Sequence, residues 1–226
     1  MAILAVGGRK GSGKDLVGQI FQYVYDCDLK QRLTATSEKD FREYIKYNHH
    51  LKCRWQIKKF ADKLKDMVCL LIGCTREQLE DQEFKETPLG DEWDNITPRL
   101  ILQKLGTEGV RDTIHQNAWV NSLMSEYKLN RHYFSDIANG REGDKSLYYP
   151  NWIITDTRFL NEIKAVEDRG GVKIRINRPN LKSNTQNEHS SETALDDFKD
   201  WDYVIDNDGT VGELIQKVKS IYVALR

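Results

Sequence analysis

The sequence predicts an α/β fold, a three-layer α/β/α arrangement in which helices cover both faces of a mostly parallel central sheet. Short apolar runs with the length of buried strands alternate along the 226 residues with longer stretches of helical periodicity. This alternation is typical of parallel strands joined by crossover helices, where ligands bind at the carboxyl ends of the strands. The strands are expected at residues 2–6, 54–58, 152–156, 172–176 and 202–206.

The first predicted strand leads directly into a glycine-rich turn, and a helix is expected to follow from residue 15 to about 26. Residues 7–14 read Gly-Gly-Arg-Lys-Gly-Ser-Gly-Lys and are called the glycine loop below. Glycines let several backbone N–H groups point at one anion, the helix start adds its positive dipole end, and a lysine reaches the outer phosphates. The spacing and the flanking elements favour a nucleotide phosphate site over a chance glycine-rich turn. The expected ligands are Gly8, Gly11, Ser12, Gly13 and Lys14.

Two carboxylates, Asp15 after the glycine loop and Asp156 at the end of a strand, stand at positions that suit a metal ion. Asp15 stands where the usual loop has Ser or Thr, whose hydroxyl binds Mg²⁺. A carboxylate can also take Mg²⁺, directly or through water, and the alternative is that Asp15 only stabilises the helix start. Asp156 ends a strand, where a carboxylate of phosphate-loop proteins holds magnesium, and its alternative role is a helix cap. We therefore expect Mg²⁺ near Asp15 and Asp156.

Composition and charge exclude several classes of protein. The formal net charge is −1, which argues against a strongly basic surface for nucleic acid. No apolar run approaches the length of a membrane span, and the start lacks the pattern of a secretory leader. The four cysteines have no C-x-x-C spacing, so we expect reduced thiols rather than a zinc site. These features predict a cytoplasmic enzyme with neither nucleic acid nor membrane as partner.

Helix starts in the middle of the chain are marked by capping residues. Asp62 is expected to be an N-cap, Thr75 and Gln78 have capping-box spacing, and Thr97 precedes a proline at the first helical position. Residues 85–94 are expected to form a loop, and the run 106–111 is expected to interrupt or end the helix before it. The apolar face of the first of these helices is expected to consist of Leu64, Met67, Val68 and Leu71.

The remaining segments are divided between regular and irregular structure. Further helices are expected at residues 118–127, 159–169 and 211–222. The polar stretch 27–51 is expected to contain helical pieces and loop. The segments 128–151 and 178–200 are expected to be a surface insertion and a candidate lid.

Two classes of nucleotide-binding protein compete on these residues. One is a phosphotransferase with ATP as donor and a phosphorylated acceptor, and the other is a switch NTPase or a non-catalytic nucleotide-binding module. The Asn-Lys-x-Asp motif by which switch GTPases read guanine is absent from the sequence. A kinase needs an acceptor pocket, for which residues 60–120 supply Lys65, Arg99, Gln103, Thr107, Glu108 and Trp119. Arginines suit phosphate because the guanidinium fork donates two parallel hydrogen bonds, and the candidates are Arg99, Arg111, Arg175 and Arg178.

The chain resembles the phage deoxynucleoside monophosphate kinases, a branch of the nucleoside monophosphate kinases with the P-loop kinase fold. The resemblance includes the glycine loop with Asp15, Leu-Gln-Lys-Leu-Gly-Thr-Glu at 102–108 and Asp-Thr-Arg-Phe at 156–159. It departs from the expected pattern at Lys63, where proline is expected. It covers about half of the chain, and the residues that carry it are, in order, 8–15, 60–65, 75–80, 84–90, 99, 102–108, 111, 119, 156–159, 161–162, 178–179, 189, 191–192 and 207–210.

The resemblance implies transfer of the γ-phosphoryl group of ATP to a deoxynucleoside 5′-monophosphate, with Mg²⁺ as cofactor. Catalytic roles would fall to Lys14, Asp156, Arg158 and Arg178. The acceptor would contact Lys65, Arg99, Gln103, Gly106, Thr107, Arg111, Trp119, Arg158 and Glu162. The glycine loop and Asp15 would hold the ATP phosphates, and the adenine would be bordered by Asn207, Gly209 and Thr210.

The implied architecture is a single kinase domain over residues 1–226. Its acceptor-binding helical region is expected at about 27–127, its insertion at 128–151 and its lid at 178–200. A P-loop kinase of another small phosphorylated molecule, such as dephospho-coenzyme A, is the second interpretation. ATP and the monophosphate are the implied partners, in the host cytoplasm if the chain is phage-encoded. The accepted base, the strictness of deoxyribose selection and the oligomeric state, monomer or homodimer, stay open.

Overall fold

The computed structural model describes residues 3–47, 53–131, 147–179 and 193–226. The chain divides into two compact units, Met1–Lys58 with Tyr127–Arg226 and Lys59–Glu126. The first contains the main sheet and is called the sheet unit, and the second is called the helical unit. Among the described residues, no helix combines the length and the apolar character that crossing a membrane requires.

The centre of the sheet unit is a five-stranded sheet in which every pairing is parallel, as the sequence predicts. The strands lie in the order β2, β5, β1, β6 and β7, so the first strand of the chain is in the middle. Because parallel strands run in one direction, their carboxyl ends share one edge. The strands are β1 (Ile3–Gly7), β2 (Trp55–Lys58), β5 (Asn151–Thr157), β6 (Val172–Asn177) and β7 (Tyr203–Asp206).

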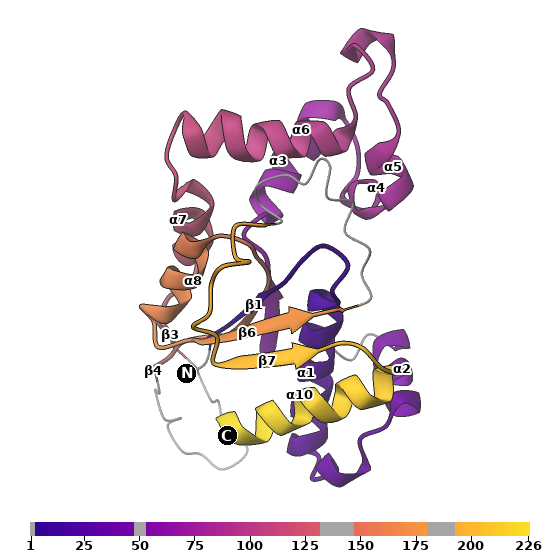
Figure 1. Ribbon diagram of the computed structural model, residues 1–226, viewed down its shortest axis with the longest axis vertical. Helices are drawn as coiled ribbons and strands as arrows, with labels where there is room; N and C mark the ends of the chain where they lie inside the picture. Colours follow the sequence, from indigo (N-terminus) through magenta and orange to yellow (C-terminus); the bar gives the residue numbers. More distant parts are fainter. Residues whose placement is uncertain (1–2, 48–52, 132–146, 180–192) are drawn as a thin grey trace, which may run out of the picture. The chain divides into compact units, whose positions relative to one another are not determined.

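Helices cover both faces of this sheet. The neighbouring helices α1 and α10 pack against the face that contains the side chain of Leu4 (Figure 1). Successive side chains of a strand point to opposite faces, and Ile3 borders Gly171 together with Val166 of α8 on the other face. The three-layer arrangement is therefore the predicted one. The helices of this unit are α1 (Lys14–Leu29), α2 (Glu38–Lys46), α8 (Leu160–Glu167) and α10 (Val211–Leu225), with a 3-10 turn η1 (Leu33–Ala35).

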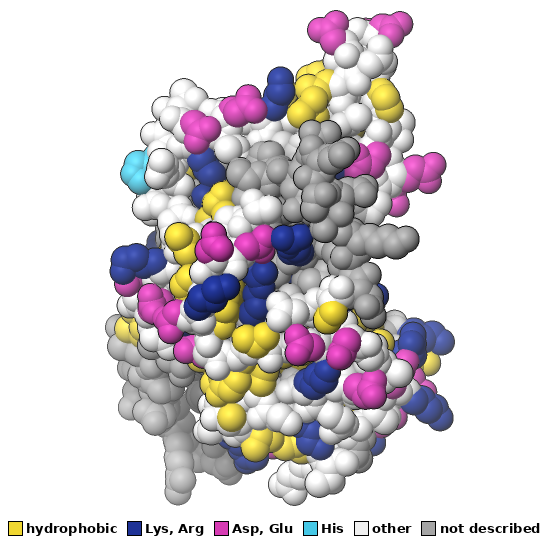
Figure 2. Space-filling view, in the orientation of Figure 1, with side chains coloured by type: hydrophobic (Ala, Val, Ile, Leu, Met, Phe, Trp, Pro, Cys, Tyr) yellow, Lys and Arg dark blue, Asp and Glu magenta, His cyan; other side chains and the backbone are white. Residues whose placement is uncertain are grey.

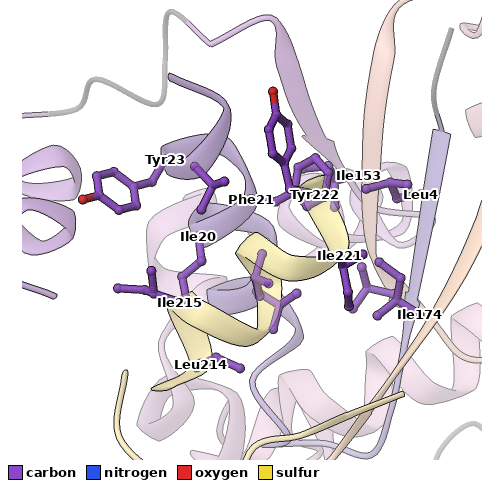
Figure 3. Packing of buried hydrophobic residues seen from close by; sticks show 14 of the residues in the cluster. Leu4, Ile20, Phe21, Tyr23, Ile153, Ile174, Leu214, Ile215, Ile221 and Tyr222 are labelled. Carbon is purple, nitrogen blue, oxygen red and sulfur yellow. The ribbon is translucent and has the colours of Figure 1, made fainter. Parts of the chain in front are cut away.

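The main core lies between the sheet and the pair of helices α1 and α10. Buried side chains of the strands, among them Ile153 and Ile174, meet Phe21 of α1 and Tyr222 of α10 (Figure 3). The ring of Phe21 makes edge contacts with Trp55, at 4.9 Å between centroids, and with Tyr222, at 5.4 Å. Such aromatic pairs add about 0.5–1.5 kcal/mol each beyond area burial. This packing fixes α1, and with it the end of the glycine loop.

The helical unit begins its helices where the capping residues predict. The side chain of Thr75 accepts a hydrogen bond from Gln78 N, with the reciprocal bond of a capping box, and Thr97 accepts from Leu100 N. These bonds satisfy backbone donors that have no partner inside the helix. The elements are α3 (Asp62–Ile72), α4 (Arg76–Glu80), α5 (Gln82–Glu86), η3 (Asp91–Trp93), α6 (Pro98–Lys104), a π-helix η4 (Leu105–Asp112) and α7 (Ala118–Met124).

The first helix of this unit differs from its prediction. Ala61, not Asp62, is the N-cap residue, and the carboxylate of Asp62 instead forms an ion pair of 2.6 Å with Arg76. Leu64 and Val68 of the predicted apolar face are buried. The other two members, Met67 and Leu71, are 45% and 54% exposed, so the buried stripe is narrower than the spacing suggests.

Later helices of the unit differ as well. The first two residues of the predicted loop 85–94 belong to the helix α5, which ends at Glu86. That helix begins after Asp81, whose side chain caps it by accepting a hydrogen bond from Phe84 N. The run 106–111 does interrupt the α-helix before it, because α6 ends at Lys104 and the run lies in the π-helix η4. The helix expected at 118–127 stops at Met124.

Three expected surface segments extend beyond the described residues. The ends of the insertion 128–151 form an antiparallel pair, β3 (Asn130–Arg131) and β4 (Leu147–Tyr148), and residues 132–146 lie outside the described part. Residues 180–192 of the candidate lid also lie outside it, and so do residues 48–52 of the polar stretch.

Candidate active site

The glycine loop joins β1 to α1 at the carboxyl edge of the sheet. Gly8 and Gly13 have φ values of 153° and 102°, in the region that side chains with a Cβ rarely adopt. A Cβ on Gly8 would lie 2.5 Å from the carbonyl oxygen of Ile176, and one on Gly13 would lie 2.6 Å from Nδ2 of Asn207. Glycine is therefore required here by both backbone conformation and space.

Lys14 lies folded against this loop. Its side chain is buried, and Nζ donates hydrogen bonds to the carbonyl oxygens of Gly8 at 2.7 Å and Arg9 at 2.8 Å. The hydroxyl of Ser12 is also buried and has no hydrogen-bond partner among the described residues. A buried orphan hydroxyl is rare in folded proteins, and in the same loop as an ammonium group it suits an anion. This pair fits the predicted phosphate site.

Two further strands contribute side chains to the loop, as expected for a shared carboxyl edge. Arg178, just after β6, donates from Nη1 to the carbonyl oxygen of Gly11 at 3.0 Å. Asn207, just after β7, donates from Nδ2 to the carbonyl oxygen of Ser12 at 2.9 Å. The structure thus brings both predicted residues to the loop, where Asn207 braces its backbone.

Asp15 and Thr155 connect the first turn of α1 to β5. The hydroxyl of Thr155 donates a hydrogen bond of 2.5 Å to Oδ1 of Asp15. Thr155 immediately precedes Asp156, which is partly buried, so two carboxylates and a hydroxyl belong to adjoining elements. Sequence reasoning missed Thr155, although a threonine within an apolar strand next to a predicted metal carboxylate was an available signal.

Glu162, a predicted acceptor ligand, has a structural function in the chain. It is buried, and Oε2 accepts hydrogen bonds from the backbone N–H groups of Arg158 at 2.7 Å and Phe159 at 3.1 Å. This carboxylate therefore caps the start of α8 and holds the backbone of Arg158. Contact of Glu162 with a substrate stays a prediction.

Asp196 joins two arginines at the loop. It pairs with Arg9 of the loop at 2.6 Å and with Arg175 of β6 at 3.1 Å. Burial raises the pKa of Asp196, but the hydrogen bonds from Arg9 and Arg175 outweigh this effect and hold the pKa below its ordinary value. Asp196 lies in an irregular polar stretch, and no motif in the sequence indicated this contact.

Gly209 and Thr210 lie at the start of α10. Thr210 is its N-cap, and its backbone N–H donates to Oε2 of Glu213 at 2.7 Å. The side chain of Glu213 also fills the space beside Gly209, where a Cβ would lie 2.1 Å from Oε2. The structure thus gives these two residues a capping role, and adenine binding stays a prediction for them.

Two of the predicted acceptor cations of the helical unit, Arg99 and Lys65, are paired with carboxylates. Arg99 donates to Glu86 and, at 2.9 Å, to Oε1 of Gln82. Lys65 contacts Glu80 at 2.7 Å. Each of these cations can exchange a carboxylate for a phosphate, because both partners are anions of similar hydrogen-bonding geometry.

The π-helix η4 contains the other predicted acceptor residues. Trp119 is buried, and its Nε1 donates to the carbonyl oxygen of Gly106 at 2.9 Å. A Cβ on Gly106 would lie 2.8 Å from Cδ2 of Leu64, so glycine permits close packing against α3. Trp119 thus supports the wide helical turn. π-Helical turns occur frequently at functional sites.

Three polar side chains remain from the predicted acceptor set. Gln103 and Thr107 are partly buried, and neither side chain makes a hydrogen bond to another described residue. Arg111 lies with Nη1 3.5 Å from the carbonyl oxygen of Gln116. Gln103 and Thr107 therefore retain donors and acceptors for a ligand.

Residues 57–218 match the family model described as deoxynucleotide monophosphate kinase. The chain belongs to this family. It is 33% identical over 166 residues to a protein of Acanthamoeba polyphaga mimivirus named "Putative deoxynucleotide monophosphate kinase". The aligned residues make up 72% of this chain and 80% of that protein. The deoxynucleotide monophosphate kinase of Enterobacteria phage T4 is 32% identical over 132 residues, and that of Escherichia phage RB69 is 30% identical over 133. The match covers 58% and 59% of this chain but only 46% of each phage protein, so the chain spans about half the length of these two relatives.

Membership of the deoxynucleotide monophosphate kinase family confirms the resemblance and makes the chain a phosphotransferase. It decides against the switch NTPase, the non-catalytic module and the dephospho-coenzyme A kinase. The family also covers both units, because the matched residues 57–218 begin in β2 and end in α10.

A kinase of this family is expected to use Mg²⁺, and the oxygen atoms present suit that ion. Within the described residues, no cluster of three or more His, Cys, Asp or Glu side chains could enclose a metal. Mg²⁺ is usually held by one or two carboxylates together with substrate phosphates rather than by a protein cage. Asp15 and Asp156 fit that pattern, since Asp15 directly follows Lys14 and Asp156 directly follows Thr155, whose hydroxyl contacts Asp15.

Proposed function

We propose that this chain transfers the γ-phosphoryl group of ATP to a deoxynucleoside 5′-monophosphate, which gives the deoxynucleoside diphosphate and ADP. The family match carries the proposal. The glycine loop supports it, because Lys14 and the buried hydroxyl of Ser12 form a site suited to phosphate. We assign the reaction to the cytoplasm and to nucleotide synthesis for DNA.

In this proposal the glycine loop binds the phosphates of ATP. Lys14 leaves the carbonyl oxygens of Gly8 and Arg9 and turns to the outer phosphates, which replace neutral dipoles by a full opposite charge. Arg178 is close enough to the loop, through its contact with Gly11, to add a second positive charge. Mg²⁺ would be held by Asp15 and Asp156 and would neutralise charge on the transferred group.

The acceptor phosphate needs no general base, because it is already an anion at neutral pH. Catalysis is then positioning together with electrostatic stabilisation of the transferred phosphoryl group. Lys14, Arg158 and Arg178 are the side chains that we assign to this stabilisation. Water must be excluded during transfer, since ATP would otherwise be hydrolysed, and the segment 178–200 is the proposed lid.

We assign recognition of the acceptor to the helical unit. Arg99 and Lys65 would exchange their carboxylate partners, Glu86 and Glu80, for the acceptor phosphate. Gln103 and Thr107 would read the nucleoside, because their hydrogen-bonding groups are free of other described residues. The Trp119 and Gly106 pair would hold this surface in shape rather than stack on the base.

The test is a panel of acceptors with ATP and Mg²⁺, scored by release of ADP. The panel contains the four deoxynucleoside monophosphates, the matching ribonucleotides, dephospho-coenzyme A and a reaction without acceptor. We expect at least one deoxynucleoside monophosphate to stimulate ADP release far above the acceptor-free rate. Equal rates with and without every acceptor would refute the proposed function, and turnover of dephospho-coenzyme A alone would replace it.

A further inference from the structure

The buried hydroxyl of Thr155 and the exposed carboxylate of Asp15 form a pair at the end of the glycine loop. Thr155 is 1% exposed, and its hydroxyl reaches Oδ1 of Asp15 at 2.5 Å. Asp15 lies in the first turn of α1 directly after Lys14 and is exposed to solvent. One oxygen of a solvent-facing carboxylate is therefore fixed from inside the protein.

Two local features bring the pair together. The register between β1 and β5 shifts between Ala5 and Gly7, which places an irregularity of β5 at Thr155 and the residue after it. Such bulges re-aim side chains and are frequent next to active sites. On α1, a Cβ at Gly18 would lie 2.7 Å from Cγ2 of Thr155, so glycine there allows helix and strand to approach.

The pair places a carboxylate where a usual phosphate loop has a hydroxyl, and a hydroxyl beside the strand carboxylate. In the usual arrangement the hydroxyl follows the loop lysine and a carboxylate lies on the strand. Here the residue after Lys14 is Asp15, and the hydroxyl of Thr155 comes from the strand. The helix thus supplies a carboxylate, and the strand supplies the hydroxyl that binds it, directly before Asp156 at the usual position of the strand carboxylate.

We propose that Thr155 is a positioning residue, which orients the Asp15 carboxylate toward the Mg²⁺ ion of the bound nucleotide. The inference rests on the proposed function, in which Asp15 takes part in the metal site. An exposed carboxylate loses side-chain entropy when it binds an ion, and a partner that already fixes one oxygen reduces this cost. Groups that orient metal ligands commonly alter metal affinity without touching the metal.

A purely structural role for Thr155 predicts something different. A buried hydroxyl needs a hydrogen-bond partner, and Asp15 supplies one whatever its function. Loss of that bond would then lower the melting temperature and change nucleotide affinity equally with and without Mg²⁺. The dependence on Mg²⁺ is the readout that separates the two roles.

The experiment measures ADP affinity by calorimetric titration, once with Mg²⁺ and once with EDTA, for the wild type, Thr155→Val and Thr155→Ser. Valine preserves the branched shape and removes the hydroxyl, whereas serine keeps the hydroxyl. We expect Thr155→Val to leave ADP affinity in EDTA within about twofold and to weaken the Mg²⁺-dependent part by about tenfold, the lower range for such positioning groups. Thr155→Ser should restore most of it. The melting temperature of each variant is recorded as a check on folding.

A double-mutant cycle with Asp15→Asn tests whether Thr155 acts through Asp15. In the Asp15→Asn background, Thr155→Val should change the Mg²⁺ dependence by less than about twofold, because coupled residues are not additive. Additive effects, or a Mg²⁺ dependence of Thr155→Val that overlays the wild type, would overturn the inference.

Two controls keep the result decisive. If Thr155→Val does not fold, Thr155→Ala compared with Thr155→Ser removes the same hydroxyl in a smaller side chain. If the wild type shows no binding of ADP that depends on Mg²⁺, the proposed function fails with it. A wild type with this dependence and an unaffected Thr155→Val reject the positioning role alone.

Discussion

At the scale of single residues, Lys14 of the sheet unit and Arg99 of the helical unit share one feature, namely that each already has an oxygen partner. Lys14 donates to carbonyl oxygens of its own loop, and Arg99 donates to Glu86 and Gln82. A bound phosphate must replace these partners. The net gain in binding free energy is the difference between the two sets of hydrogen bonds. Each hydrogen bond to a charged group contributes about 1.5–3 kcal/mol. Truncation should therefore affect binding and rate more than folding.

Lys14→Met should reduce kcat by about 10²–10³-fold, the range for removal of one preorganised charge-stabilising donor. Methionine keeps the buried stem but cannot contact the outer phosphates, and the fold should survive. The measurement is steady-state turnover at saturating ATP, with the melting temperature recorded in parallel. Lys39→Met, an exposed lysine of α2, is the matched control and should leave kcat unchanged. Near-normal turnover of Lys14→Met would remove Lys14 from the donor site.

Arg99→Ala should weaken the acceptor monophosphate. Loss of one charge-assisted contact costs about 1.5–3 kcal/mol, which is about ten- to hundredfold in kcat/KM for the acceptor. Kinetics with each substrate varied in turn separate the two sites. Arg42→Ala removes an arginine that pairs with Glu38 in α2, away from the proposed acceptor residues, and should change neither constant. A change confined to the ATP constant would assign Arg99 to the donor.

At the scale of elements, the segment 193–202, which includes the end of the candidate lid, is in contact with the glycine loop. Asp196 pairs with Arg9 and Arg175. Trp201 packs against Gly7, where a Cβ would lie 2.4 Å from its ring, and Asp200 pairs with the buried Lys173 at 2.8 Å. These contacts hold the segment to β1 and β6, so the part of the candidate lid that follows residue 192 is fixed to the sheet.

Asp196→Asn tests this anchor through the pH dependence of stability. The pKa of Asp196 is lowered from 3.8, so its charge stabilises the fold fully above that value and loses the effect as the pH falls through the lower folded pKa. We expect the variant to be less stable by about 1 kcal/mol at pH 7, because the pair is partly exposed. Urea unfolding at pH 7, 5 and 3.5 should show an equal difference at the first two and a smaller one at the third. A difference that does not shrink at pH 3.5 would contradict the ion-pair explanation.

Helix boundaries show which elements could be predicted from the sequence. Thr75 and Thr97 were correctly predicted as helix starts. A side-chain cap joins residues three positions apart, so the sequence alone is enough to predict it. The π-helix could not be read in the same way. Its wide turn depends on Gly106 packing against Leu64 and on the bond from Trp119, and both are tertiary contacts. Asp62 likewise looked like a cap but pairs with Arg76, which is distant in sequence.

The residues of the candidate site also divide into those that could be predicted from the sequence and those that depend on tertiary contacts. Lys14, Arg178 and Asn207 were expected at one edge because strand order and parallel pairing place them there, and the structure brings them to the glycine loop. Thr155 and Asp196 were missed. Their partners, Asp15 and the pair of arginines, lie on other elements, and neither residue belongs to a motif that names such a partner.

At the scale of the whole molecule, charge is balanced locally as well as in total. The chain has 34 basic and 35 acidic residues, and on the visible face the two kinds are interspersed (Figure 2). Two of the proposed ligand cations, Arg99 and Lys65, take part in this balance through Glu86 and Glu80. Affinity for nucleotides therefore depends on local exchange of partners rather than on a long-range field, and it should be specific to a few phosphates.

The single-domain expectation makes a prediction about how the two units unfold. The helical unit, Lys59–Glu126, is a segment of the size in which one core rarely supplies more than about 3–5 kcal/mol. Both of its ends continue directly into the sheet unit, at β2 and at Tyr127, whose ring packs 4.9 Å from Trp152. We therefore expect the two units to unfold in one cooperative transition.

Saturating ADP with Mg²⁺ turns this expectation into a measurement, because the proposed ligand contacts of ADP lie in the sheet unit. At a hundred times its dissociation constant, a ligand stabilises the folded state by about 2.7 kcal/mol, which for a chain of this size raises the melting temperature by about 5–10 °C. If unfolding is cooperative, calorimetry should show one transition that moves as a whole, and hydrogen exchange should slow in α3 as well as in β5. Lys14→Met at the same ADP concentration is the control and should move little. Two transitions, of which ADP shifts only one, would show that the helical unit folds on its own and that the chain has two domains.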